Sequence, residues 1–345
     1  SYINLDLHNT YCLFWCKAHH PPPLCPFSFS LSETYFYLHV QKTSMQEHNY
    51  DDWRAAGALS YKAINFAKGL AKPGAKLIDI AKAVEEFVKE NGQTSAFPIN
   101  LSINEAAAHY TPGFNDATAL DEKSLLKIDY GTKKGTGAGD CAVSVDLTGE
   151  YGKLVEASEQ ALQNALSLVK AGRKVREIGK EIERTIKSFS EDFNPIRNLG
   201  GHGITETDLH ADIFIPNFDN GDETELEEGQ IAAIEPFVTT GEGYVVDGDI
   251  VEIFSFMPNG SLPRSQEARD LASYIYSNFS TYPFAMRWIV EHVGSEFKAK
   301  KAINELLAAG MLEPFPVLVE RSKGVVAQTE AAFIVEKDSC EVITK

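Results

Sequence analysis

Residues 125–147 read LLKIDYGTKKGTGAGDCAVSVDL, and this stretch decides the fold class. In each of its two apolar runs, apolar and polar residues alternate as they do in strands that bury one face. The alternation puts Lys127 and Asp129 on one face of the first strand, and Asp140 with Ser144 on one face of the second. The Gly-rich link 131–139 suits a hairpin or a bulged turn, because glycine tolerates positive φ. Asp129 and Asp140 can then face one another.

Helical patterns lie on both sides of this stretch. A helical period starts at about residue 51 and breaks at Lys72-Pro73-Gly74, and a second helix is predicted over 77–90. Two more are predicted over 156–171 and 175–189. Strands lie between and after these pairs. Two rounds of paired helices and antiparallel strands predict an α+β domain with two similar halves.

Four carboxylates and one histidine lie in or beside apolar, strand-like runs: Asp129, Asp140, His202, Glu235 and Glu330. An ionised carboxylate is expensive to bury, and four in one site would repel each other unless cations neutralised them. The set therefore predicts a metal site. Any one acid, taken alone, fits a strand-end or solvent-facing position as well.

Composition narrows the class of protein. The 345 residues include 32 basic and 49 acidic ones, a formal charge of -17, which argues against general affinity for nucleic acid or an anionic membrane. No apolar run reaches the roughly 20 residues that span a bilayer, and no secretory signal is visible. The expected location is the cytoplasm.

The cysteines fit the same compartment. There are five, an odd number, so a disulfide framework is not expected. Cys12, Cys16 and Cys25 with His19 and His20 could form a small zinc site, but their spacing is not a standard one for zinc ligands.

The order of the five metal-site residues resembles a known family. IDYG with Asp129, GDCAVSV with Asp140, GGHGI with His202, IEPF with Glu235 and QTE with Glu330 look like the metal ligands of methionine aminopeptidases. FPINLSINEAAAHYTP (97–112) and LHADIFIPN (209–217) resemble the segments that hold that family's substrate-side histidines. YPFAMRWIVEHVG resembles part of the insertion of type II, archaeal-like members. The resemblance covers about residues 48–345.

The resemblance implies a fold and a domain plan. The fold would be the pita-bread fold, shared with prolidase and aminopeptidase P. The catalytic domain would occupy 45–257 and 321–345, with a helical, winged-helix-like insertion at 258–320. Residues 1–44 would be a leader of uncertain structure, with Met45 as a candidate start. Winged helices often bind DNA, but the insertion has no basic recognition stripe, which favours a structural role or one in shaping the rim of the active site.

The resemblance also implies roles for the site residues. Two divalent ions, of Co, Mn, Fe or Zn, would be bridged by Asp140 and Glu330. Asp129 would complete the ligands of one ion, and His202 with Glu235 would complete those of the other. Glu235 would also accept the proton of the attacking water.

Three further residues would face the substrate. His210 would assist the scissile amide and His109 would lie near the new amine, although either could be a hydrogen-bonded core histidine. Phe97 would be a wall of the methionine pocket, although a core position is also open for it.

The implied activity is a metallo-aminopeptidase, a hydrolase that removes the initiator methionine from new chains during protein maturation. Expected partners are nascent polypeptides beginning with methionine and the ribosome, and the expected state is a monomer. A prolidase or aminopeptidase P-like peptidase and a non-catalytic pita-bread binding protein are the alternatives. One departure from the family pattern is Ala331-Ala332, where the family usually has His-Thr.

Overall fold

The structure, a computed structural model, describes residues 50–345. The leader 1–44, with Met45 and the cysteines and histidines considered as a zinc site, lies outside the described residues. Within residues 50–345, no helix combines the length and the apolar character needed to cross a membrane.

Two pairs of helices flank the central sheet, as predicted. They are α1 (Asp51–Leu70), α2 (Leu77–Glu90), α3 (Gly152–Leu168) and α4 (Val175–Phe189). The predicted extents of α1, α2 and α4 are confirmed. The prediction for α3 was shifted, since the helix begins at Gly152 rather than Glu156 and ends at Leu168 rather than Ala171.

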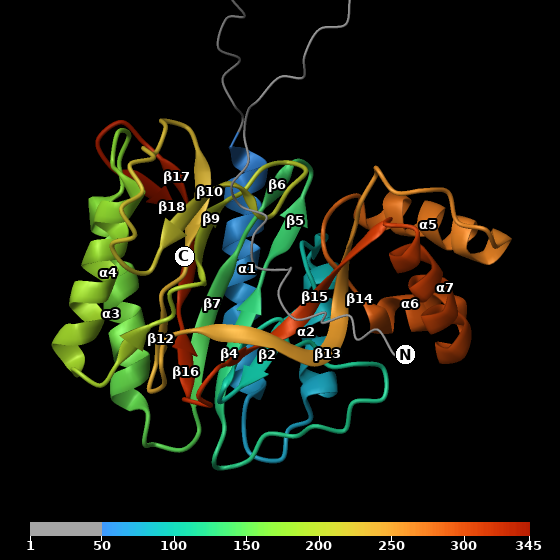
Figure 1. The fold of residues 1–345 in the computed structure, drawn as a ribbon, viewed down its shortest axis with the longest axis horizontal. Helices are drawn as coiled ribbons and strands as arrows, with labels where there is room; N and C mark the ends of the chain where they lie inside the picture. The colour runs from blue at the N-terminus through green and yellow to red at the C-terminus, as the bar shows by residue number, and fades with distance from the viewer. Residues whose placement is uncertain (1–49) are drawn as a thin grey trace, which may run out of the picture. The chain divides into compact units, whose positions relative to one another are not determined.

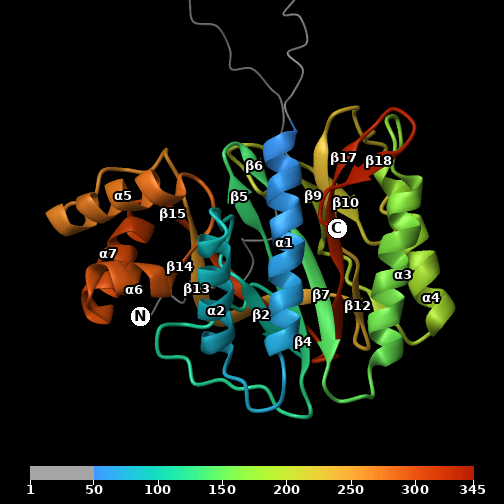
Figure 2. The same cartoon turned by 180° about the vertical axis from the view of Figure 1, so that it is seen from behind.

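The main sheet has the strand order β10-β9-β11-β17-β7-β4-β2, with β18 beside β17. All of these pairs are antiparallel. The strands are β2 (Asn100–Ile103), β4 (Leu125–Tyr130), β7 (Cys141–Asp146), β9 (Gly200–Gly203), β10 (Ala211–Pro216), β11 (Ile231–Ile234), β17 (Glu330–Val335) and β18 (Cys340–Val342). α1 packs on β4 and β7, while α3 and α4 pack on the half that contains β9, β10 and β11 (Figures 1 and 2).

Three smaller sheets complete the fold. One is a hairpin of β5 (Thr132–Lys134) and β6 (Gly137–Ala138) within the Gly-rich link 131–139, joined by β1 (Thr94–Ser95). The second contains β8 (Asn194–Pro195), β12 (Phe237–Thr239) and β16 (Val326–Gln328). The third has the order β14-β13-β15-β3, with β3 (Ala106–Ala108), β13 (Val245–Phe256), β14 (Phe284–Ala285) and β15 (Leu312–Glu320).

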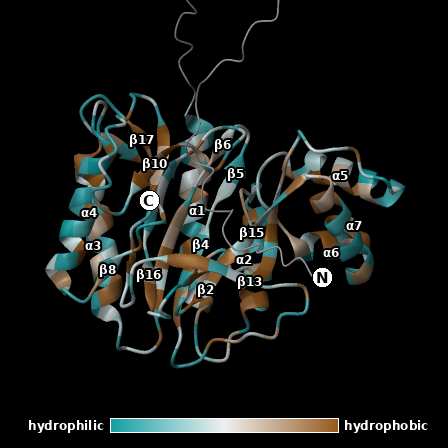
Figure 3. Ribbon diagram, viewed as in Figure 1, coloured by the Kyte–Doolittle hydropathy of each residue, from teal (hydrophilic) through white to brown (hydrophobic). Residues whose placement is uncertain are grey.

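The two halves have separate hydrophobic cores. One core includes Ile80, Val84 and Ile128, under α1 and α2. The other includes Ile178, Ile182 and Phe333, under α3 and α4. Hydrophobic residues gather on the strands, while the outer sides of α3 and α4 are hydrophilic (Figure 3). The predicted two-half α+β arrangement is thus what the chain forms.

The segment 258–320 contains α5 (Gln266–Phe279), α6 (Met286–Val293) and α7 (Glu296–Ala308). These helices pack with β13 and β15 around a third core. Ser265 and Ser295 cap α5 and α7 by accepting the backbone N–H three residues on, the usual role of serine at a helix start. The limits of the predicted insertion and its winged-helix character stay predictions.

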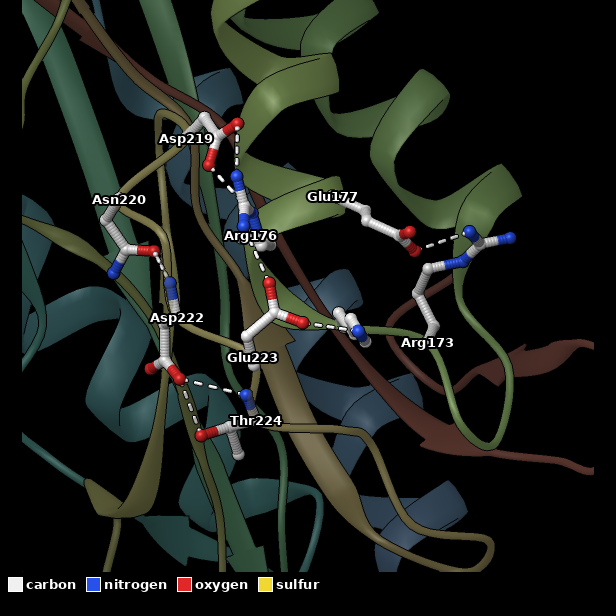
Figure 4. A network of polar contacts seen from close by, with 9 residues as sticks. Arg173, Arg176, Glu177, Asp219, Asn220, Asp222, Glu223 and Thr224 are labelled. Carbon is white, nitrogen blue, oxygen red and sulfur yellow. Dashed lines mark hydrogen bonds and ion pairs between the residues drawn. The ribbon is translucent and has the colours of Figure 1, made fainter.

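A polar network ties the start of α4 to the loop after β10 (Figure 4). The Arg176 guanidinium donates to both carboxylate oxygens of Asp219, at 3.0 and 3.1 Å, and to Glu223 Oε1 at 2.6 Å. Lys174 also contacts Glu223. Asn220 and Asp222 side chains accept backbone N–H groups two residues on, which holds the loop in tight turns.

Candidate active site

The five predicted metal-site residues and the three predicted substrate-side residues line one cavity. They are Phe97, His109, Asp129, Asp140, His202, His210, Glu235 and Glu330. The cavity volume is about 60 Å³, which leaves room for several water-sized groups, since one water needs roughly 10–15 Å³.

Asp129 and Asp140 reach the cavity from neighbouring antiparallel strands. Asp129 is in β4 opposite Ala142, and Asp140 directly precedes β7. A side chain at Gly139 would place its Cβ 2.7 Å from the Gly57 Cα of α1. Only glycine therefore lets the chain pass α1 closely enough to deliver Asp140.

His202 and Glu235 come from the other half of the sheet. His202 lies in β9 opposite Ala233 of β11, and Glu235 follows β11 directly. A Cβ at Gly201 would stand 2.1 Å from the Ala233 carbonyl oxygen, so close pairing of β9 and β11 requires glycine there.

Glu330 joins the halves. It begins β17 and pairs with Ala142, which lies two positions after Asp140 along the chain. The closest ligand atoms are those of Asp140, His202 and Glu330, which all lie within 4.8 Å of one another. His202 Nε2 is 3.6 Å from Asp140 Oδ2 and 3.9 Å from Glu330 Oε1.

Gln328 links the remaining two acids. Its Nε2 donates to Asp129 Oδ2 at 3.1 Å and to Glu235 Oε2 at 3.2 Å. The side chain is fully buried, so the amide is committed to this bridge. Strand alternation places Gln328 on the face of Glu330 but assigns it no role, and the structure supplies its contacts.

All four carboxylates have raised pKa values. Burial raises the pKa of Asp129 to about 7, although the hydrogen bond from Gln328 opposes the rise. Burial, and then the negative charge of Asp129, raise the pKa of both Asp140 and Glu235 well above the usual range. Burial and then Asp140 do the same for the pKa of Glu330. Such a site favours protons or cations over free negative charge.

The tautomer of His202 fits a metal ligand. Its Nδ1 lies 3.2 Å from the Gly203 carbonyl oxygen. A carbonyl can only accept, so Nδ1 carries the hydrogen and Nε2 presents a lone pair to Asp140 and Glu330. Burial lowers the pKa of His202, which keeps the ring neutral and able to bind a cation.

The residues present fit divalent cations. Asp129 Oδ1 and Asp140 Oδ1 are buried, and no hydrogen-bond donor among the described residues reaches them. Buried carboxylate oxygens without donors are rare unless an ion satisfies them. Together with the lone pair of His202 they form a mixed oxygen and nitrogen donor set of the kind that binds transition metals.

His109 sits at the end of β3 with an unusual backbone. Its φ of 63° is in the left-handed region, which a non-glycine residue occupies only when its surroundings enforce it. Its Nδ1 donates to the Pro316 carbonyl oxygen at 3.3 Å, which leaves the Nε2 lone pair free to accept. Burial lowers the pKa of His109 to about 4, so the ring is neutral near pH 7.

His210 lies at the exposed edge of the cavity, just before β10. Its ring centroid is 4.5 Å from that of His202. The Phe315 ring touches both substrate-side histidines, with its centroid 5.7 Å from that of His109 and 6.3 Å from that of His210. No motif singles out Phe315, whose place depends on the pairing of β15 with β3.

The apolar residues that line the cavity include Phe97, Ile253, Pro283 and Phe315. Phe97 is predicted as a pocket wall. Ile253 was missed because it stands in no motif, and Pro283 because its motif, YPFAMRWIVEHVG, was assigned only to the insertion. Phe97 is only 5% exposed and also belongs to a hydrophobic core.

Ala331 and Ala332, the departure from the family pattern, are buried in β17 and do not line the cavity. The Ala332 backbone N–H donates to Thr344 Oγ1 at 3.1 Å.

Comparison with known proteins shows the family of this chain. A model of metallopeptidase family M24 matches residues 51–255. The methionine aminopeptidase of Thermococcus kodakarensis is 41% identical over 290 residues, which cover 84% of this chain and 97% of that protein. The methionine aminopeptidase of Saccharolobus solfataricus is 36% identical over 301 residues, 87% of this chain and 99% of that protein.

Solved structures share the fold at lower identity. A thermophilic Arx1 superposes with a TM-score of 0.74 at 17% identity, covering 85% of this chain and 89% of that one. Methionine aminopeptidase from Rickettsia prowazekii gives 0.60 at 20% identity, with 85% and 95% covered. Prolidase from Pyrococcus furiosus gives 0.56 at 16% identity, with 87% and 64% covered. Likeness at this identity shows the fold alone.

Proposed function

The chain belongs to metallopeptidase family M24 and, within it, to the methionine aminopeptidases, and on that premise we propose how its residues remove an N-terminal methionine. It has the pita-bread fold and is a metal-dependent hydrolase. The observation that carries the proposal is the convergence of four carboxylates and a neutral histidine on one cavity.

We propose that Asp129, Asp140, His202, Glu235 and Glu330 hold two divalent ions. Asp140 and Glu330 would hold an ion together with His202, since their carboxylate oxygens lie 3.6 and 3.9 Å from His202 Nε2. Divalent ions supply a water of lowered pKa and a polarised carbonyl when they are bound. A nitrogen ligand among oxygens suits Co, Mn, Fe or Zn better than Mg.

Glu235 is the proposed proton carrier. It would take a proton from the water that attacks the methionyl carbonyl carbon, and give it to the amine nitrogen when the carbon–nitrogen bond breaks. The Gln328 amide holds one of its oxygens at 3.2 Å and so fixes which oxygen is free to move the proton.

The two substrate-side histidines would orient the substrate. His109 Nε2 carries a lone pair, which suits acceptance of a hydrogen bond from the new amine. His210 lies over His202 at the cavity edge, where it can assist the scissile amide. We predict that His210→Ala lowers kcat while the metal content stays unchanged. Loss of metal from the purified variant would instead make His210 a ligand.

The apolar wall would receive the methionine side chain. A thioether packs favourably against an aromatic ring edge, and Phe97 offers such a ring beside Ile253 and Pro283.

The proposed substrates are new polypeptides that begin with methionine followed by a small residue. We propose that the protein acts as a monomer near ribosomes in the cytoplasm, where such chains emerge. The two free thiols in the described part of the chain, Cys141 and Cys340, suit that reducing compartment.

The test is release of methionine from Met-Gly-Met-Met, with Gly-Pro-Met in parallel, by metal-reconstituted protein and a chelated control. Chelator-sensitive release from the first peptide alone is the expected result. Cleavage of Gly-Pro-Met before proline, measured as free glycine, would point to the prolidase or aminopeptidase P-like alternative. No release from either peptide with Mn, Co, Fe and Zn would indicate a binding protein.

A further inference from the structure

The segment 258–320 contacts the chain beside both substrate-side histidines. We propose that this segment sets the positions of His109 and His210, with Arg287 and Tyr282 as positioning residues. The inference rests on the proposed function, because it concerns the two histidines to which that function assigns substrate roles.

Arg287 of α6 is the first anchor. The side chain is 1% exposed, and its guanidinium donates to Thr111 Oγ1 at 2.6 Å and to the Pro112 carbonyl oxygen at 3.2 Å. It also forms an ion pair with Glu85 of α2, which Trp288 Nε1 holds from the other side at 3.1 Å. A buried charge is stable only with its partners in place, so these contacts fix where residues 111 and 112 lie.

Those residues closely follow the strained turn at His109. A φ of 63° at a histidine persists only if the chain is held on both sides. On the near side β3 pairs with β15, and the Pro316 carbonyl oxygen accepts from the ring. On the far side the Tyr110 carbonyl accepts from Leu101 N at 2.6 Å, and Arg287 holds the next two residues. Arg287 therefore completes the clamp around His109.

Tyr282, in the turn between α5 and β14, is the second anchor. Its side chain is 3% exposed, and its hydroxyl donates to the Thr205 carbonyl oxygen at 2.8 Å. The neighbouring Thr281 hydroxyl donates to the Thr207 carbonyl. The Lys133 ammonium lies 3.6 Å from the Tyr282 ring centroid, which fixes the ring itself.

The Thr205 turn leads to His210. Thr205 N donates to the Asp208 carbonyl at 2.8 Å, and Thr205 Oγ1 accepts from Asp208 N at 3.0 Å. Asp208 Oδ1 then accepts the His210 N–H at 3.0 Å. Residues 205–208 are exposed and belong to no strand or helix. The Tyr282 bond thus connects an exposed segment without regular structure to a packed core.

The segment also touches both rings directly, through Phe315 of β15. His109 and His210 come from different parts of the chain. Through Phe315, the segment 258–320 contacts both of them. α5 and α6 stand at one side of the main sheet, where both contact β13 and α6 also contacts β14 (Figure 1). A shift of the segment would move both histidines relative to the metal-site residues.

The test uses variants that remove one hydroxyl each, Thr111→Val and Tyr282→Phe. Matched controls are Thr185→Val, which removes a buried hydroxyl bonded to Asn164 in the other half, and Tyr276→Phe on the exposed face of α5. We expect kcat for Met-Gly-Met-Met to fall about tenfold in the two test variants, because small misplacement of a catalytic group is costly. Bound metal per chain should be unchanged, and the controls should keep wild-type kcat.

Double variants distinguish an effect on the positions of the two histidines from a general loosening of the fold. Thr111→Val in a His109→Ala background, and Tyr282→Phe in a His210→Ala background, should lower kcat by less than about twofold, because the residue acted upon is gone. An undiminished tenfold fall in those backgrounds would overturn the inference, and so would wild-type kcat in both single variants. Full activity of His109→Ala and His210→Ala would overturn the proposed histidine roles themselves, a result distinct from failure of the anchors.

Discussion

The buried acidic residues of the site would carry negative charges that the folded chain alone does not stabilise. Asp140 and Glu330 are almost fully buried. Burial and then the charge of Asp129 raise the pKa of Asp140, while burial and then the charge of Asp140 raise the pKa of Glu330. A cation that binds all of them would remove that repulsion, which is why the residue types predict the chemistry.

Asp140→Asn and Glu330→Gln separate stability from catalysis. Either change should lower kcat by more than about 100-fold, since even residues that only support ligands cost 10–100-fold. The metal-free variant should melt at a higher temperature than the metal-free wild type, because one repelling charge is gone. Assays of the reconstituted proteins and melting of the chelated ones check both parts. Near wild-type kcat would contradict the metal role.

Gln328 should matter for metal affinity. Gln328→Met keeps the length of the side chain but removes the amide that bridges Asp129 and Glu235. We expect metal binding to weaken about 10–100-fold with the fold intact. Calorimetric titration of the chelated variant with Mn²⁺ measures this, and an unchanged dissociation constant would show that the bridge does not orient the two acids.

The sequence pointed to those residues of the cavity whose side chains cost free energy to bury. Acids and a histidine inside apolar runs stand out, so the five residues that we propose as metal ligands could be selected from the amino-acid pattern. Gln328 and Phe315 could not, because a buried amide or ring has many possible reasons. Lys127 is another such case, since its buried ammonium donates to the Asn104 carbonyl at 2.6 Å, a contact that only tertiary pairing creates.

Among the secondary-structure elements, features set by local sequence signals were predictable, and features set by contacts between distant residues were not. The limits of α2 and α4 were predictable, because helical period and the Asn91-Gly92 and Asn194-Pro195 breaks are local signals. The start of α3 was missed because Gly152 is a poor helix former, and packing decides the first turn. The order of strands in the sheets depends on contacts far apart in sequence, which no local pattern encodes.

Glu320 at the end of β15 should show a distinct pH effect. This fully buried carboxylate accepts four hydrogen bonds, from Gly243 N, Ser322 N, Ser322 Oγ and Gly324 N. Burial raises its pKa, but these donors outweigh burial and hold the pKa below the usual 4.5. A lowered pKa stabilises the fold above pH 4.5, and that stabilisation is lost as the pH falls through the native value.

Glu320→Gln replaces one accepting oxygen with a donor that opposes backbone N–H groups. We expect the free energy of unfolding at pH 7 to fall by about 1–3 kcal/mol, and the difference from wild type to shrink at acidic pH. Urea unfolding at pH 7 and at pH 4 measures both. A pH-independent difference would mean that the charge of Glu320 does not stabilise these loops.

At the scale of the whole molecule, the site joins the two halves. Asp129 and Asp140 come from one half, His202 and Glu235 from the other, and Glu330 from the strand between them. Metal binding should therefore stabilise the entire catalytic fold, because a ligand that binds only the folded chain raises its stability.

The metal-free protein should be less stable at neutral pH than at mildly acidic pH. The pKa of Asp129 rises from 3.8 to about 7 on folding. A raised carboxyl pKa means that stability is complete below about pH 4 and is lost as the pH rises to about 7. Melting of chelated protein at pH 5 and pH 8 should show a lower midpoint at pH 8, and saturating Mn²⁺ should restore it. An equal midpoint at both values would contradict the buried, repelling carboxylates.

The most direct measurement titrates Mn²⁺ or Co²⁺ into chelated protein while following binding heat and methionine release from Met-Gly-Met-Met together. The proposed function predicts saturable binding of two ions per chain and activity that rises with occupancy. Full methionine release by the chelated protein, or binding without any release, would contradict a metal-dependent methionine aminopeptidase site at these residues.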